Sequence, residues 1–398
     1  MIPKINLSET KKIIQKMSLQ KPDIPFSPVV LKFIEDLSEE IKKNRDSFNF
    51  PDLITFSFFC RKGNLEILKK NFLICNNRIG KGLVFHITPT NIPINFAYSL
   101  IFSLLAGNNN IIRVPSKNYF QVDLINKCLN KVSKKKIYRY VKDKFYLIRY
   151  EKNKEITKAI SSKCDVRIIW GGDDTVKSIR SIMLPPKSID ISFPDRYSFC
   201  IINSDSFNKM RDFEIKKLAY NFFNDTYLVD QNACSSPHLI VWIGKFKKKN
   251  VEMFWQELAN YVEEKYKLIE SSAFEKYNLL LKNFLYKHNL KLNKKYLNNL
   301  YRIELSKIDK DTINLRGKFG LFFEYKANNL QNISKLISKK VQTVTYSGFK
   351  KEKLLKFIID EKLNGIDRFV PIGSALNIGL TWDGFNLINV LSREIEIR

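Results

Sequence analysis

Short apolar runs alternate with helix-like stretches along the first half of the chain. Residues 82–88 and 111–114 read as buried strands, and residues 94–106 read as a helix that ends at Gly107. A helix near 121–132, strands at 146–150 and 166–170, and a helix near 175–182 follow. An earlier helix begins after the capping pair Ser27-Pro28. Strands that alternate with helices predict an α/β fold with a doubly wound parallel sheet.

The second half repeats this style. The pattern predicts a helix over 213–223, a polar loop, a strand over 238–243, an amphipathic helix over 251–266, and strands over 319–325 and 341–346. The pattern breaks near residues 195–199, where we place a domain boundary.

The chain is strongly basic, with 68 Lys and Arg against 40 Asp and Glu and a net charge of +28. Such a charge suits nucleic acid or an acidic membrane, but no nucleic-acid-binding motif is visible and acids such as Glu35 and Asp36 are interspersed. We therefore expect a solvated basic surface that attracts anionic substrates, and no nucleic-acid partner. The longest apolar stretch, 92–107, is shorter than the ~20 residues of a membrane span, so no transmembrane segment is expected.

Cysteine and histidine usage argues against disulfides and metals. The six cysteines form no CxxC pair, and the three histidines are scattered. The first residues lack the apolar stretch of a signal peptide. These features predict free thiols in a reducing cytoplasm and no metal site.

Cys234 lies in the loop Asp-Gln-Asn-Ala-Cys-Ser-Ser-Pro, residues 230–237. Its neighbours are small or polar, and this openness suits a nucleophile better than a packing cysteine. Upstream, Asn91 stands between Pro89 and Pro93, after a predicted strand and before a helix. A rigid amide donor there would stabilise an oxyanion, and an asparagine helix cap is the equally good alternative.

Three further groups are candidates for holding a dinucleotide. Arg113, Ser116 and Lys117 follow a strand and suit a ribose or 2′-phosphate, or else form a solvated strand end. Gly171 and Gly172 permit close approach to a pyrophosphate, although the GxGxxG fingerprint is missing. Glu324 ends an aromatic strand, where it would hold a nicotinamide ribose or remain an exposed charge.

Several segments, in this order, resemble the LuxC-type acyl-CoA reductases (long-chain fatty acid reductases) of the aldehyde dehydrogenase superfamily. They are residues 85–93, 104–116, 169–173, 230–237, 367–373 and 382–384. The resemblance implies an NAD(P)-binding domain over 1–198, a catalytic domain over 199–372 and a C-terminal oligomerisation segment over 373–398. It places Cys234 on the acyl-accepting nucleophile and Asn91 on the oxyanion donor. It places Arg113 and Ser116 beside the adenosine ribose of the cofactor and Gly171 and Gly172 beside its pyrophosphate. Thr88, Pro89, Lys117 and Glu324 complete the candidate cofactor-binding residues.

One departure from the superfamily bears on the direction of the reaction. Oxidising aldehyde dehydrogenases carry Glu-Leu-Gly-Gly before the nucleophile, and its glutamate activates water; residues 188–197 here contain no such segment. An acyl enzyme without that base resists hydrolysis, which favours reduction. The N-terminal region is also short for the luminescence enzymes of this family.

These arguments predict NADPH-dependent reduction of a long-chain acyl thioester to an aldehyde through S-acyl-Cys234. The acyl donor is acyl-CoA, an acyl carrier protein or an acyl-synthetase partner, and the resemblance implies a homo-oligomer. The alternatives are a cysteine acyltransferase or thioesterase without redox chemistry, with His238 near the cysteine in sequence, and a basic protein that binds nucleic acid or membrane surfaces.

Overall fold

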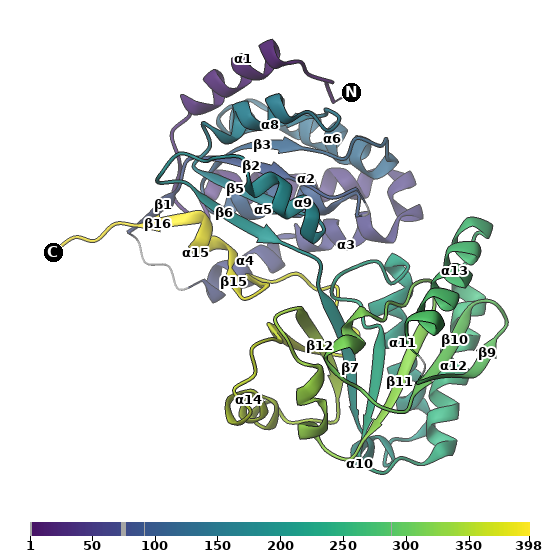
Figure 1. The fold of residues 1–398 in the computed structure, drawn as a ribbon. Helices are drawn as coiled ribbons and strands as arrows, with labels where there is room; N and C mark the ends of the chain where they lie inside the picture. The colour runs from purple at the N-terminus through teal and green to yellow at the C-terminus, as the bar shows by residue number, and fades with distance from the viewer. Residues whose placement is uncertain (1, 73–76, 91, 288) are drawn as a thin grey trace. The chain divides into compact units, whose positions relative to one another are not determined.

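The computed structural model describes residues 2–72, 77–90, 92–287 and 289–398. The chain forms two compact units, one of residues 1–195 with 378–398 and one of residues 196–377. Each unit contains a mainly parallel sheet with helices on both faces (Figure 1). This confirms the predicted α/β class and its doubly wound sheets.

The first unit is built on a five-stranded parallel sheet of order β4-β3-β2-β5-β6. Its strands are β2 (Leu83–Ile87), β3 (Asn109–Arg113), β4 (Phe145–Ile148), β5 (Val166–Trp170) and β6 (Ile189–Phe193). The chain leaves β2 toward β3 on one side and later returns to the other side as β5. The two strands therefore flank the topological switch point, where open α/β sheets bind ligands at the carboxyl ends of their strands.

Helices and short pairs surround this sheet. The helices are α1 (Leu7–Ser18), α2 (Pro28–Lys43), α3 (Pro51–Phe59), α4 (Lys62–Asn71), α5 (Asn95–Leu105), α6 (Phe120–Ser133), α7 (Arg139–Lys142), α8 (Lys154–Ser161), α9 (Asp173–Arg180) and α15 (Leu387–Leu391). The short strands are β1 (Arg78–Gly80) with β16 (Ser392–Glu394), and β14 (Thr381–Trp382) with β15 (Phe385–Asn386). The expected helix start at Ser27-Pro28 and the expected stop at Gly107 (φ +90°) are both confirmed.

The second unit contains seven strands in the order β13-β12-β7-β8-β11-β10-β9, all parallel to their neighbours except β9. They are β7 (Tyr197–Asn203), β8 (Leu239–Ile243), β9 (Leu290–Tyr296), β10 (Leu300–Leu305), β11 (Leu321–Ala327), β12 (Val341–Ser347) and β13 (Arg368–Pro371). The helices are α10 (Ser204–Phe207), α11 (Asp212–Thr226), α12 (Lys248–Lys265), α13 (Glu270–Tyr286) and α14 (Lys351–Asp360). Short 3₁₀ turns, among them η3 (Tyr227–Val229), complete the unit.

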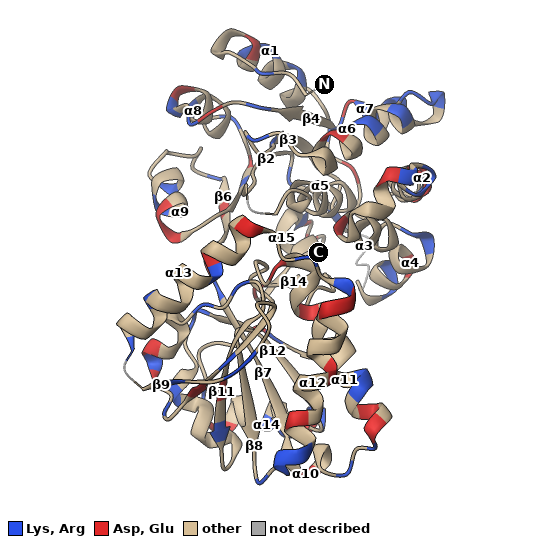
Figure 2. Ribbon diagram, turned by 90° about the vertical axis from the view of Figure 1, so that its right-hand side faces the viewer, with Lys and Arg blue, Asp and Glu red and all other residues tan. Residues whose placement is uncertain are grey.

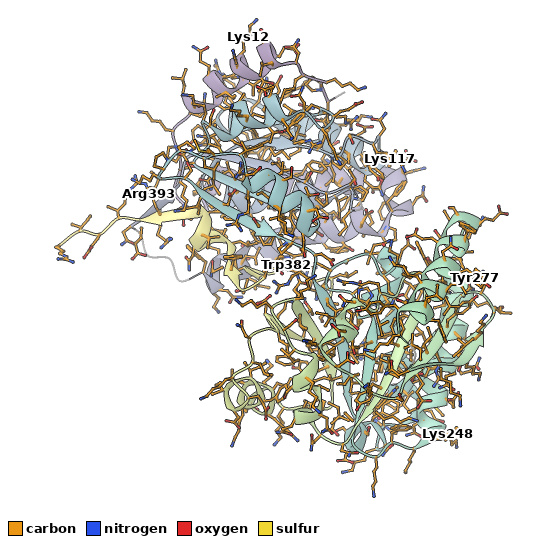
Figure 3. The ribbon with its side chains drawn as sticks, in the orientation of Figure 1. Lys12, Lys117, Lys248, Tyr277, Trp382 and Arg393 are labelled. Atoms are coloured by element: carbon orange, nitrogen blue, oxygen red, sulfur yellow. The ribbon has the colours of Figure 1, made fainter. Side chains whose placement is uncertain are left out.

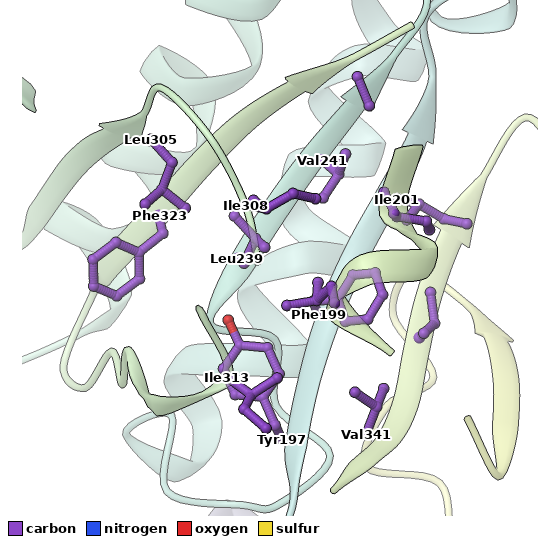
Figure 4. Close-up of a cluster of buried hydrophobic side chains, with 14 of the residues drawn as sticks. Tyr197, Phe199, Ile201, Leu239, Val241, Leu305, Ile308, Ile313, Phe323 and Val341 are labelled. Atoms are coloured by element: carbon purple, nitrogen blue, oxygen red, sulfur yellow. The ribbon is translucent and has the colours of Figure 1, made fainter. Parts of the chain in front are cut away.

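The central strands of the second sheet are buried on both faces. Phe199, Ile201, Leu239 and Val241 point into one core cluster (Figure 4), whereas Cys200 and the alternating residues of the same strands face α11 and α12. Burial on both faces explains why β8 reads as a continuous apolar run rather than an alternating one. β7 begins inside the stretch 195–199, where the sequence pattern showed a break and no strand was predicted. Because adjacent parallel strands run in register, their first residues lie along one edge, and this edge carries the cysteine loop.

Candidate active site

The loop that carries Cys234 connects η3 to the amino end of β8. Asp230 and Gln231 both have positive φ (54° and 57°), which reverses the chain immediately before Cys234. The buried Gln231 side chain fixes this reversal: its Nε2 donates to the carbonyl of Pro237 (3.1 Å), and its Oε1 accepts from the amide of Gly320 (3.0 Å). The left-handed backbone costs free energy, and these hydrogen bonds offset it. Sequence reasoning missed Gln231 because one of its partners, Gly320 just before β11, is 89 residues away in sequence.

Two strand ends hold Cys234 itself. At the start of β7, the Ser198 hydroxyl donates to the Cys234 carbonyl at 2.6 Å. At the start of β12, the Gln342 Nε2 donates to Cys234 Sγ at 3.3 Å. Cys234 is therefore at the amino edge of this parallel sheet, opposite to the edge where α/β sheets usually bind ligands.

Exposure separates Cys234 from the other described cysteines. Cys60, Cys128, Cys164 and Cys200 are buried, whereas Cys234 is only partly buried. Burial raises the pKa of the Cys128 thiol to about 11 and that of the Cys164 thiol to about 12. Thiols with such pKa values are poor nucleophiles at neutral pH, so the accessible Cys234 is the best candidate among the described cysteines.

His238 is not arranged as a general base. Its ring is buried, and Nδ1 lies 3.0 Å from the carbonyl oxygen of Gly317. Burial, with Arg316 close by, lowers the pKa of His238 to about 3. An imidazole with this pKa is a weak proton acceptor, which argues against the Cys-His pairing that the non-redox alternative requires.

The buried Asp225 links the cysteine loop to a second segment of the same unit through hydrogen bonds. Asp225, on α11, accepts from the amides of Gly373 (2.6 Å) and Ala375 (2.7 Å) through its side chain. Its own carbonyl accepts from the Ser236 hydroxyl at 2.8 Å. One residue thus connects the loop to the chain that follows β13. Burial raises the pKa of Asp225 to about 7.

The cofactor candidates of the first unit gather at the carboxyl ends of β2, β3 and β5. Thr88 and Pro89 follow β2, and the Thr88 hydroxyl donates to the carbonyl of Arg113 at the end of β3 (2.8 Å). Arg113 itself lies 4.7 Å above the Tyr150 ring and donates weakly to the Tyr150 carbonyl. Ser116 and Lys117 are exposed, and Lys117 is labelled in Figure 3.

The turn after β5 leaves room for close approach. Gly171 and Gly172 precede α9, and a Cβ built on Gly172 would meet nothing within 4 Å. Its φ of −64° is open to any residue, so packing does not explain this glycine. Asp173 and Asp174 occupy the first turn of α9. Their charge disfavours a phosphate there and suits ribose hydroxyls, whereas Ser116 and Lys117 suit the phosphate. The donor set therefore fits a dinucleotide.

The structure corrects both expectations for the position of Glu324. It lies in the middle of β11, not at its end, and it is 5% exposed. Its carboxylate accepts from Trp242 Nε1 (3.1 Å), Trp255 Nε1 (2.8 Å) and Arg302 Nε (2.8 Å). These contacts build a buried ion pair and lend no support to a ribose-binding role.

Asn91, the expected oxyanion donor, lies outside the described residues. Among the described residues, no cluster of three metal-ligating side chains is present and no helix is long and apolar enough to cross a membrane. Figure 2 shows both signs of charge on the helices of each unit. A cavity of about 280 Å³ lies at the opposite edge of the second sheet, between the ends of β7, β8 and β11 and helix α14. The cysteine loop does not line this cavity.

The chain is similar in sequence to acyl reductases and similar in fold to aldehyde dehydrogenases. Long-chain acyl-protein thioester reductase 2 of Photobacterium leiognathi is 28% identical over 188 residues, or 47% of this chain and 36% of that protein. The Aliivibrio fischeri long-chain acyl-protein thioester reductase is 24% identical over 48% of this chain and 37% of its own length. The chain thus matches well under two thirds of the length of these relatives.

Solved structures share the fold over nearly the whole chain. Glyceraldehyde-3-phosphate dehydrogenase GapN of Methanocaldococcus jannaschii, in complex with NADP, superposes with a TM-score of 0.67 at 14% identity, covering 98% of this chain and 94% of that one. Aldehyde dehydrogenase 21 of Physcomitrella patens gives 0.64 at 12% identity, covering 94% and 84%. The family model described as Acyl-CoA reductase (LuxC) matches residues 65–394. The chain therefore belongs to the LuxC acyl-CoA reductase family and has the aldehyde dehydrogenase fold.

Proposed function

We propose that this protein reduces a long-chain fatty acyl thioester to the aldehyde with NADPH, through an S-acyl intermediate on Cys234. The observation that carries the proposal is the partly exposed Cys234. Its sulfur accepts a hydrogen bond from the buried side-chain amide of Gln342. Membership of the acyl-CoA reductase family supports the substrate class, as do the names of the sequence relatives.

The proposed chemistry uses the sulfur twice. The Cys234 thiolate adds to the thioester carbonyl and forms a new C–S bond. The old C–S bond then breaks, the carrier thiolate leaves with the electron pair, and the S-acyl enzyme remains. Bound NADPH would supply the hydride that reduces the acyl carbon. The resulting thiohemiacetal collapses: the new C–S bond breaks, the aldehyde departs and the Cys234 thiolate returns. Sulfur suits both steps because a thiolate adds readily and leaves readily.

We assign the oxyanion of both tetrahedral species to the Asn91 amide and the backbone amide of Cys234. Preorganised donors stabilise charge that develops in the transition state, and loss of one donor costs about 10²–10³ in rate. We expect Asn91→Ala to slow turnover on that scale and to leave the folded state unchanged by circular dichroism. Unaltered turnover would remove Asn91 from the mechanism.

Thr88, Pro89, Gly171 and Gly172 are proposed to border the cofactor at the switch point of the first sheet. Arg113, Ser116 and Lys117 are proposed to select the 2′-phosphate. The preference for NADPH over NADH then depends on the cations, so Arg113→Ala with Lys117→Ala should lower it. A preference that survives both substitutions would refute this assignment.

The acyl donor is proposed to be acyl-CoA, an acyl carrier protein or the acylated form of a synthetase partner, and we propose a homo-oligomer acting in the cytoplasm. The relatives are named acyl-protein thioester reductases, which favours a protein-bound acyl group. Light scattering of the purified protein at micromolar concentration tests the oligomer, and a monomeric mass contradicts it.

NADPH oxidation with a long-chain acyl-CoA, followed by absorbance, tests the central proposal. Cys234→Ala should abolish both NADPH consumption and aldehyde formation. Cys200→Ala is the matched control, because Cys200 is a buried cysteine of the same unit and should leave the reaction intact. Thiol release without NADPH consumption would instead support the thioesterase alternative. If nothing is consumed, transfer of a radiolabelled acyl group to Cys234 is the second readout, and absence of label contradicts the nucleophile for that donor.

A further inference from the structure

Gln342 is a buried amide on β12. It is the second residue of β12, it is 0% exposed, and its neighbours Val341 and Val344 belong to the core of the second unit. Burying an amide is costly unless its hydrogen bonds are satisfied. Its Nε2 is directed at Cys234 Sγ, 3.3 Å away, across 108 residues of sequence. We propose that Gln342 is a catalytic residue that stabilises negative charge on the Cys234 sulfur.

A second contact fixes the direction of this amide. The Thr343 hydroxyl donates to Gln342 Oε1 at 3.2 Å, so the carbonyl end is occupied and the NH₂ end faces the sulfur. The Thr343 backbone amide donates to Ser198 Oγ at 3.1 Å, and Ser198 in turn donates to the Cys234 carbonyl. Two consecutive residues of β12 thus hold both the sulfur and the backbone of the nucleophile. This rigidity makes the donor preorganised rather than adventitious.

The inference rests on the proposed function for its place in the reaction. Charge resides on sulfur before the attack and again when the thiohemiacetal collapses, whereas the S-acyl sulfur carries none. An N–H donor 3.3 Å from the sulfur therefore stabilises the thiolate before the attack and the thiolate that forms as the aldehyde leaves. It stabilises the uncharged S-acyl sulfur less. His238 does not substitute for it, since that ring faces Gly317 and its pKa is lowered.

Alkylation by iodoacetamide tests Gln342 without any acyl donor or cofactor. The rate is measured from pH 6 to pH 10 by mass spectrometry of the tryptic peptide 218–245, in which Cys234 is the single cysteine. The variant is Gln342→Met, which keeps the length and removes both donors. Loss of a hydrogen bond to a charged group lowers the thiolate fraction about 10- to 100-fold. The thiolate of the variant is more basic and therefore more nucleophilic, which offsets about half of this loss on a logarithmic scale. The alkylation rate at pH 7 should therefore fall about three- to tenfold.

The two pH profiles should cross. At high pH both proteins are thiolates, and Gln342→Met should then react faster than the native protein because its thiolate is the more basic one. A merely structural defect changes the rate in one direction at all pH values. Thr345→Val is the matched control, since Thr345 is equally buried on the same strand and should leave the profile unchanged.

Superimposable profiles of native protein and Gln342→Met would overturn the proposal, as would a uniform change without a crossing. If Gln342→Met folds poorly by circular dichroism, Gln342→Leu must give the same crossing. A crossing in a protein that neither oxidises NADPH nor takes up a radiolabelled acyl group on Cys234 would leave Gln342 assigned and contradict the proposed reductase. NADPH oxidation together with superimposable profiles would support the reductase and remove Gln342 from the mechanism.

Discussion

Removing the Glu324 carboxylate should destabilise the second unit severely. This residue accepts hydrogen bonds from both indoles and from Arg302, whose guanidinium is 2% exposed and also contacts Glu252. In Glu324→Ala that buried guanidinium loses its buried carboxylate and keeps the more exposed Glu252 and a 3.4 Å contact with the Tyr296 hydroxyl. Breaking a buried pair from one side costs about 3–5 kcal/mol, because the remaining charge stays desolvated.

The expected change in melting temperature follows from the size of the unit. For 150–250 residues, 1 kcal/mol corresponds to about 2–4 °C, so Glu324→Ala should lower the transition of the second unit by about 6–20 °C. Differential scanning calorimetry measures this shift, and urea unfolding gives the free energy. NADPH affinity, measured below the transition, should not change, since Glu324 is occupied by protein partners.

The adjacent strand supplies a control for Glu324. Glu304 faces Glu324 across the register of β10 and β11, and it pairs with Lys326 at 2.7 Å, but its side chain is 32% exposed. An exposed pair is worth about 0–1 kcal/mol, so Glu304→Ala should shift the transition little. If Glu324→Ala costs under about 1 kcal/mol, or weakens NADPH binding in the folded protein, the structural assignment is wrong.

Three further outcomes are expected. Burial raises the pKa of Asp225 to about 7, so the native state retains a proton that the unfolded chain releases near pH 4; the free energy of unfolding should fall by on the order of 4 kcal/mol as pH rises from about 4 to 7. Urea unfolding at several pH values should show this slope flattened in Asp225→Asn, and an unchanged slope would exclude Asp225 as its origin. Gly172→Ala should keep stability within about 0.5 kcal/mol but weaken NADPH binding about tenfold by titration calorimetry, and equal affinity would place the cofactor elsewhere. Asp190 binds the fully buried Arg167 through both carboxylate oxygens (2.7 and 2.8 Å), so Asp190→Ala should lower the free energy of unfolding in urea by about 3–5 kcal/mol. Arg167→Met should cost less, because the Asp190 carboxylate that it leaves is partly exposed and can reach water. Equal costs for the two variants would contradict this reasoning.

The apolar periodicity predicted four strands of the first sheet and four of its helices, because their burial is local information; it did not predict α1, α3, α4, α8 or β6. The range 166–170 coincides with β5, and the ranges for β2, β3, α5 and α6 agree within a few residues. The pattern missed β9, whose residues are largely exposed, and β10, which carries the buried Arg302. Neither strand offers the uninterrupted apolar run that predicted β8. The pattern also missed β7, which begins inside the stretch 195–199 that we interpreted as a break between domains.

The sequence by itself determined the α/β class from the order of its elements and the family from short motifs, and it singled out Cys234 as the candidate nucleophile. Only the tertiary structure decided that Gln342 donates to the sulfur, that Gln231 fixes the loop and that Glu324 pairs with Arg302. It also decided that residues 378–398 return to the first unit. The physical reason is the same in each case: a buried polar group must find its partner somewhere along the chain, and only the strand order decides which distant residue that partner is.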